Sequence, residues 1–94
     1  MLPKRRENQY KTFVKVRADH CLDGSIKPLL FKPEGGNTYR IDRVLDIRTA
    51  ASLRAGGQGE RYTVEVEGKE LYLWQDGAYW FVETEQLGEM PEFD

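Results

Sequence analysis

Residues 60–84 read ERYTVEVEGKELYLWQDGAYWFVET, and this stretch decides the fold. Apolar and polar side chains alternate through Val64 and Val66, which is the pattern of a strand with one buried face. Two glycine turns, at Gly68 and Gly77, then separate this strand from two further strands rich in aromatic and aliphatic residues. The stretch therefore predicts an antiparallel meander joined by tight turns.

The segments before this meander also have the two-residue period of strands. Residues 10–17 and 26–31 read as strands, and Pro28 indicates an edge or a bulge in the second. Residues 38–47 continue the pattern, with a bulge or bend expected near residues 42–44. We therefore expect a mainly β protein: a five- or six-stranded antiparallel meander curled into a half-barrel or small barrel, with one short helical turn at most.

One run favours a helix, and the remaining apolar positions predict the core. Residues 50–55 are expected to form a loop with one short helical turn, which Gly56 and Gly57 end. The predicted core, with Trp80 or Phe81 added according to register, consists of Val14, Val16, Ile26, Phe31, Tyr39, Ile41, Leu45, Tyr62, Val64, Val66, Leu71, Leu73 and Val82.

The length of 94 residues suits one domain, and charge divides the chain into three parts. We predict a basic flexible arm over residues 1–9, a single β domain over residues 10–84 and an acidic tail over residues 85–94. Apolar side chains in the tail could still dock as a short helix; they are Leu87, Met90 and Phe93.

Composition also excludes several classes of function. No apolar run approaches the roughly 20 residues of a membrane helix, so we expect no membrane partner. The single cysteine fits the reducing cytoplasm. With one histidine and one cysteine, the chain predicts no metal, no cofactor and no enzymatic activity. Residues 19–25, which hold both, read as a turn.

The candidate binding residues begin with two aromatics. Tyr72 and Trp74 alternate with Leu71 and Leu73, so they face outward if the leucines are buried. Exposed aromatics beside arginine or lysine form a stacking surface for bases or a contact for a protein. The alternative is that both faces are covered, the second by the loop of residues 49–59 or by the tail.

Basic and glycine residues complete the candidate site. Gly56, Gly57 and Gly59 could direct backbone N–H groups at an anion, with Arg54 and Arg61 adding charge, although a flexible loop is the simpler interpretation. The N-terminal arm could add further charge through Lys4, Arg5 and Arg6.

Two functional hypotheses follow from these candidates. The first is a non-catalytic binding module of the bacterial cytoplasm, with a protein or single-stranded nucleic acid as its partner. The alternative is a protein-only interaction domain or a homodimer formed through a sheet edge.

The central part of the chain resembles a group of small uncharacterised bacterial β-domain proteins. The resemblance covers roughly residues 12–84, and its most distinctive segments are residues 41–48, 50–53, 56–63 and 80–83. It implies a free-standing bacterial β domain and assigns no catalytic residue.

A weaker likeness is to small β domains encoded beside translesion-type DNA polymerases, and it implies a link to DNA maintenance. The matching segments, in order, are residues 39–41, residues 44–45, residues 61–62 and Trp80. Residues 48–51 replace the aromatic pair of that family, so no binding residue is transferred from it.

Overall fold

The computed structural model describes residues 9–53 and 55–90, and its strands form one antiparallel sheet. The mainly β half-barrel predicted from the sequence is confirmed, with seven strands in place of five or six. The elements are β1 (Lys11–His20), β2 (Ile26–Pro33), β3 (Tyr39–Arg40), β4 (Arg43–Ala51), β5 (Gln58–Val66), β6 (Lys69–Asp76), β7 (Tyr79–Glu83) and α1 (Thr84–Leu87).

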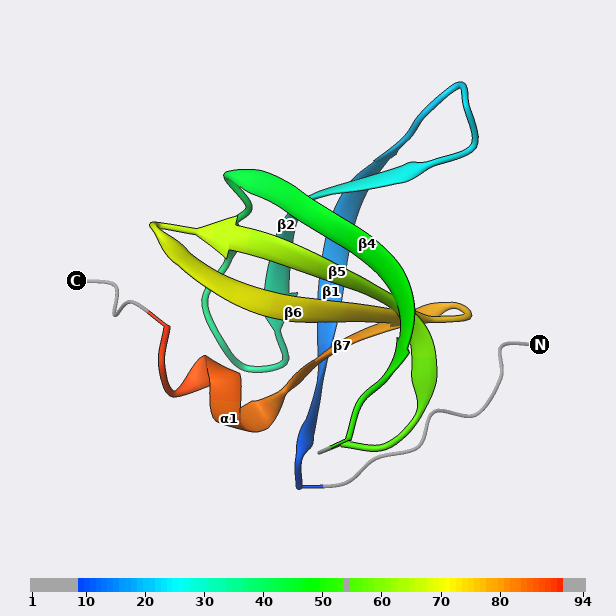
Figure 1. The fold of residues 1–94 in the computed structure, drawn as a ribbon. Helices are drawn as coiled ribbons and strands as arrows, with labels where there is room; N and C mark the ends of the chain where they lie inside the picture. Colours follow the sequence, from blue (N-terminus) through cyan, green and yellow to red (C-terminus); the bar gives the residue numbers. More distant parts are fainter. Residues whose placement is uncertain (1–8, 54, 91–94) are drawn as a thin grey trace.

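The strand order is β3-β2-β1-β7-β6-β5-β4, so the sheet consists of two consecutive units (Figure 1). Strands β1 to β3 form one unit and β4 to β7 form the predicted meander. The two units join where β1 pairs with β7, from Lys11↔Glu83 to Val14↔Trp80. Beyond this pairing the outer part of the β1–β2 hairpin projects away from the half-barrel, as Figure 1 shows.

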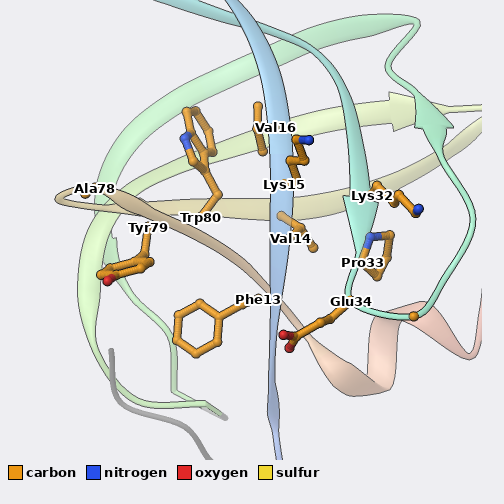
Figure 2. A pocket seen from close by; sticks show the side chains of 11 residues that line it. Phe13, Val14, Lys15, Val16, Lys32, Pro33, Glu34, Ala78, Tyr79 and Trp80 are labelled. Atoms are coloured by element: carbon orange, nitrogen blue, oxygen red, sulfur yellow. The ribbon is translucent and has the colours of Figure 1, made fainter. Parts of the chain in front are cut away.

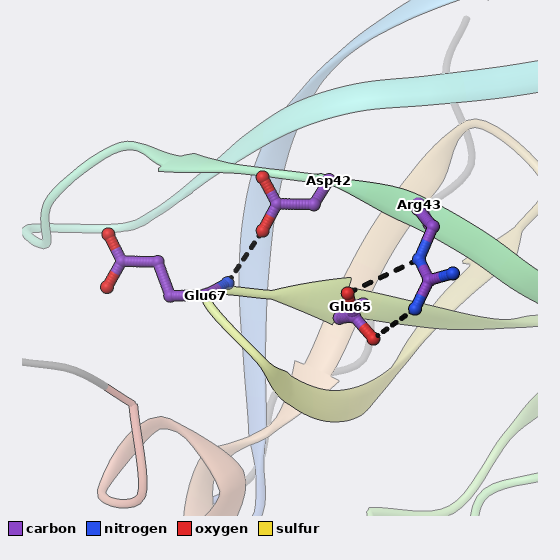
Figure 3. A network of polar contacts seen from close by, with 4 residues as sticks. All are labelled: Asp42, Arg43, Glu65 and Glu67. Atoms are coloured by element: carbon purple, nitrogen blue, oxygen red, sulfur yellow. Dashed lines mark hydrogen bonds and ion pairs between the residues drawn. The ribbon is translucent and has the colours of Figure 1, made fainter.

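Hydrogen bonds of the segment between β3 and β4 connect the two sides of the half-barrel. The backbone N–H of Ile41 donates to Leu29 O at 2.9 Å, and that of Asp42 donates to Glu65 O at 2.8 Å. The Asp42 carboxylate also accepts the N–H of Glu67 at 2.8 Å (Figure 3). This segment therefore links β2 to β5 and brings the two edges of the curled sheet together.

An ion pair holds the first residue of β4 against its neighbour. The guanidinium of Arg43 donates to both carboxylate oxygens of Glu65, at 3.3 and 2.9 Å (Figure 3). The Glu65 carboxylate raises the pKa of Arg43, so the arginine stays charged. The contact is bidentate, which fixes the orientation of both side chains.

A bulge in β4 corrects one predicted core position. The register against β5 shifts between Val44 and Asp46, which is the irregularity that the sequence predicted close to residues 42–44. Because the extra residue is Leu45, Val44 packs against the core and Leu45 is 40% exposed. The prediction that Leu45 is buried was therefore wrong.

Apolar clusters cover both faces of the sheet. The inner face carries the main cluster, which consists of Val14, Phe31, Tyr62, Val64, Val66, Leu71, Leu73, Val82 and Met90. The outer face carries a smaller cluster of Phe13, Ala55, Trp74 and Phe81. Most of the predicted core is confirmed, although Ile26 is only partly buried and lies outside both clusters.

The loop predicted at residues 50–55 begins later, because β4 continues to Ala51, and the turn that follows is closed by the N–H of Gly56 on Ser52 O. The short helix lies at α1, directly after β7. Leu87 packs against the main cluster and Met90 is buried in it, so this part of the predicted acidic tail docks on the domain. The docking predicted for Phe93 lies outside the described residues.

Candidate functional site

The two aromatics predicted as a binding surface differ in their exposure. Tyr72 and Trp74 do lie on the face opposite Leu71 and Leu73, as the alternation predicted. Tyr72 is 36% exposed, but Trp74 is only 2% exposed because Ala55 from the turn after β4 packs in the same cluster. Trp74 is thus a core residue of the outer face, and no exposed pair of rings is present at this position.

Arg61 and Tyr72 do come together. The guanidinium carbon of Arg61 lies 4.3 Å from the centre of the Tyr72 ring, a cation–π contact. Arg61 also lies directly opposite Trp74 across β5 and β6. The nitrogen atoms Arg61 Nε and Trp74 Nε1 are buried without a hydrogen-bond partner.

The glycines of the candidate loop have structural roles. Gly56 and Gly57 have φ values of +77° and +88°, which only glycine adopts at low cost. The N–H of Gly56 donates to Ser52 O, and the N–H of Ser52 donates to Gly57 O. Gly59 lies in β5, where a Cβ would overlap the carbonyl oxygen of Gln75. The turn therefore closes on itself, and the Gly56 N–H that an anion would need is already bonded.

A buried serine fastens this turn to the sheet. Ser52 is 3% exposed, and its hydroxyl accepts the N–H of Ala55 at 3.0 Å and donates to the Glu83 carboxylate at 2.9 Å. These bonds hold the turn whose Ala55 is buried in the same cluster as Trp74. Arg54, Lys4, Arg5 and Arg6 lie outside the described residues, so their predicted contributions stay predictions.

The turn predicted at residues 19–25 is shorter in the structure, because β1 extends to His20 and residues 21–25 connect it to β2 at the tip of the hairpin. Asp23 accepts two hydrogen bonds from Ser25, one from its N–H at 2.9 Å and one from its hydroxyl at 2.6 Å. The hydroxyl bond and the backbone bond lower the pKa of Asp23. His20 and Cys21 are exposed at this tip. Within residues 9–53 and 55–90, no three His, Cys, Asp or Glu side chains are grouped so as to hold a metal ion.

A site that the sequence did not reveal lies where β1 leaves β7. A hollow of about 570 Å³ opens beside Phe13, Lys15, Lys32, Tyr79 and Trp80 (Figure 2). We call it the β1 groove. It exists because β7 pairs with β1 only as far as Val14↔Trp80, which leaves the next part of β1 without a strand on that side.

The rings of the β1 groove are held by neighbouring aromatics. The Trp80 ring lies 5.2 Å from the ring of Tyr62 in the main cluster. The Tyr79 ring meets the Phe13 ring edge to face at 5.8 Å. Both Tyr79 and Trp80 are half-buried, so each ring is fixed by packing and still has accessible surface.

The charged side chains that line the β1 groove are Lys15, Lys32 and Glu34. The two lysines lie on the outer face with Phe13 and Tyr79, whereas Trp80 packs against the main cluster on the inner face. Lys15 and Lys32 lie opposite each other on β1 and β2, both exposed. By alternation and register they share the outer face with other exposed cations of this unit; together these are Lys15, Arg17, Lys27, Lys32 and Arg40, which we call the basic face. The exposed acid Asp19 lies on the same face, opposite Lys27. Ion pairs between described residues join Arg43 to Glu65 and Arg48 to Asp46, on β4 and β5.

The basic face continues into a second hollow of about 560 Å³ between β2 and residues 40–44. Its lining includes Arg17, Lys27 and Arg40. Because the whole chain has a net charge of −2, this cluster is a local concentration and not a property of the whole surface.

No family model, curated protein sequence or solved structure matches this chain significantly. Of the helices in the described part of the chain, none has the length and apolar character needed to cross a bilayer. The interpretation of the site therefore depends on its own geometry and charge.

Proposed function

We propose that the protein is a non-catalytic binding module for single-stranded nucleic acid, active in the bacterial cytoplasm. The observation that carries this proposal is the β1 groove, which is lined by the paired lysines Lys15 and Lys32 and by the half-buried rings of Tyr79 and Trp80. The single exposed cysteine, Cys21, fits a reducing compartment.

The β1 groove supplies the two interactions that unpaired nucleotides require. Ammonium groups attract the phosphates and release their counterions, which gives affinity without sequence preference. Aromatic rings stack on bases, which single strands expose and duplexes do not. Tyr79 and Trp80 are suited to this because their positions are fixed before binding, so little side-chain entropy is lost.

The basic face gives the backbone of a bound strand a path beyond the groove. From Lys15 and Lys32 it leads along β2 to the second hollow, where Arg17, Lys27 and Arg40 lie. A strand that follows this path keeps its phosphates near cations over several nucleotides, as in other single-strand binding proteins.

The test is fluorescence anisotropy with labelled single-stranded DNA and RNA of about 10 nucleotides, within the usual site size of such modules. We expect binding whose affinity falls steeply with salt. At about 50 mM salt, Lys15→Glu should weaken binding roughly tenfold or more, because it removes at least one phosphate contact.

The matched control is Lys69→Glu, which makes the same charge change away from the β1 groove, where the Lys69 ammonium bonds Glu89 O. It should change the affinity about threefold at most, through net charge alone. Trp80→Leu keeps an apolar side chain against Tyr62 and should weaken binding with little effect on the salt dependence. The proposal fails if no oligonucleotide binds at low salt, or if both charge variants lose the same affinity.

A further inference from the structure

The edge strand β4 carries an inference that goes beyond the proposed nucleic-acid binding and does not depend on it. β4 is the last strand in the sheet order and pairs only with β5. Its first residues approach β2 at the second hollow, but residues 45–51 have no described strand on their outer edge. Their unpaired backbone groups can pair with another strand.

Two large apolar side chains of this edge are exposed. Ile47 lies opposite Tyr62, which is 3% exposed, yet Ile47 itself is 46% exposed. Leu45, at the bulge, is 40% exposed. Ile47 thus faces the same side as the main cluster without being covered, as expected of a residue at a contact surface.

The charges of β4 are arranged symmetrically around Ile47. Asp46 precedes it and Arg48 follows it, and both lie on the face opposite Ile47, where Arg48 is exposed and Asp46 is partly exposed. In the single chain, Arg48 Nε donates to Asp46 Oδ2 at 2.7 Å. If two copies of β4 lie antiparallel about a two-fold axis at Ile47, Asp46 of each copy lies opposite Arg48 of the other.

We propose that the protein forms a homodimer in which the β4 edges of two copies pair antiparallel about a two-fold axis at Ile47. The two isoleucines meet on the inner face, and two Asp46–Arg48 pairs form between the chains on the outer face. The pairing joins two seven-stranded sheets into one and satisfies the free backbone groups of both edges. A second copy is the partner because the charge pattern is complementary to itself.

The first part of the test is the mass of the native protein, measured by light scattering and by sedimentation over a wide concentration range. We expect a concentration-dependent dimer. Asp46→Lys and Arg48→Glu each place like charges opposite each other twice, so each variant alone should raise the dissociation constant about tenfold or more. Ile47→Lys should do the same, and Leu22→Lys, at the exposed tip of the β1–β2 hairpin, should change nothing.

The second part tests whether Asp46 and Arg48 pair between chains in this register. In an equimolar mixture of the Asp46→Lys and Arg48→Glu variants, the introduced lysine of one chain lies opposite the introduced glutamate of the other. The native Arg48 of the first chain then lies opposite the native Asp46 of the second. We expect this mixture to form a heterodimer with near-native affinity. If Asp46 and Arg48 matter only within one chain, mixing restores nothing and the proposal is wrong.

The remaining outcomes are equally decisive. A native protein that stays monomeric at millimolar concentration overturns the proposal, and so does a dimer that none of the β4 variants weakens. Circular dichroism of each variant shows whether it is folded. A variant that is folded, monomeric and rescued by its complement supports the β4 pairing, whether or not any nucleic acid binds.

Discussion

The rings of Trp74 and Phe81 lie parallel on the outer face of the sheet, with centroids 5.5 Å apart and planes inclined by 3°. The two residues are direct neighbours across β6 and β7. Phe13 continues the row on β1, and its ring meets that of Phe81 at 6.4 Å, while Lys11 Nζ lies 4.4 Å from the Phe81 centroid. A row of aromatics on three strands thus stabilises the junction between the two units of the sheet.

Trp74→Ala tests whether this row is a core. Removing a buried tryptophan leaves a cavity and should lower the free energy of unfolding by about 3–5 kcal/mol. Tyr72→Ala, two residues earlier on the same face, removes a more exposed ring and should cost about 1 kcal/mol. Urea denaturation measures both values, and equal small losses would mean that Trp74 is a surface residue.

Gly59→Ala tests the close approach of β5 and β6. A Cβ at Gly59 would overlap the backbone of Gln75, so the strands must separate, and we expect a loss of about 3 kcal/mol. Gly56→Ala is the control: it has a positive φ but no neighbour within 4 Å, and should cost only about 1 kcal/mol. Thermal unfolding measures both losses. If Gly56→Ala lowers the stability more than Gly59→Ala does, the conformation of the turn matters more for stability than the close approach of β5 and β6.

Ser52→Ala tests the two hydrogen bonds by which the Ser52 hydroxyl holds the turn after β4 against the sheet. The substitution leaves the buried N–H of Ala55 without its acceptor and Glu83 without this donor, so we expect a loss of about 1–3 kcal/mol. Thr49→Ala removes a comparable but exposed hydroxyl bond to Glu60 and should cost less than about 1 kcal/mol. Amide hydrogen exchange should also quicken around Ala55 in the serine variant alone.

The sequence predicted most of the sheet because its signals are local. Two-residue alternation identifies the buried faces of β5 and β6, and glycines of positive φ, such as Gly68 and Gly77, identify the hairpins between consecutive strands. The strand count was too low because residues 38–47 were interpreted as one strand with a bulge or bend, whereas the chain changes partner at Ile41 and Asp42. That change depends on contacts with β2 and β5, which are distant in sequence.

The candidate site was less predictable because it depends on register. Lys15 and Lys32 become neighbours only through the pairing of β1 with β2, in which the register shifts close to Pro28. Trp74 is buried in a cluster that includes Ala55 from the turn between β4 and β5. Periodicity gives the face of a residue, but it does not give what lies above that face.

The phenol of Tyr62 predicts a loss of stability at alkaline pH. Its side chain is buried in the main cluster, and burial, together with the negative charge of Glu60, raises the pKa of Tyr62 above its ordinary value of about 10. The folded state thus holds the neutral phenol more strongly than the unfolded state does. The resulting stability is fully present below the unfolded pKa and is lost as the pH rises through the folded pKa.

Tyr62→Phe provides the comparison, since it keeps the buried ring and removes the ionisable group with its 3.4 Å contact to Gln75. We expect the unfolding free energy of the native protein to fall more steeply than that of the variant between about pH 10 and pH 12. Absorbance of tyrosinate near 295 nm gives an independent measurement, because one tyrosine should ionise late in the native protein and this component should disappear in the variant. If the tyrosinate absorbance curves of the two proteins differ only by one tyrosine with an ordinary pKa, Tyr62 is accessible to water in the folded state. The assignment of Tyr62 to the core is then wrong.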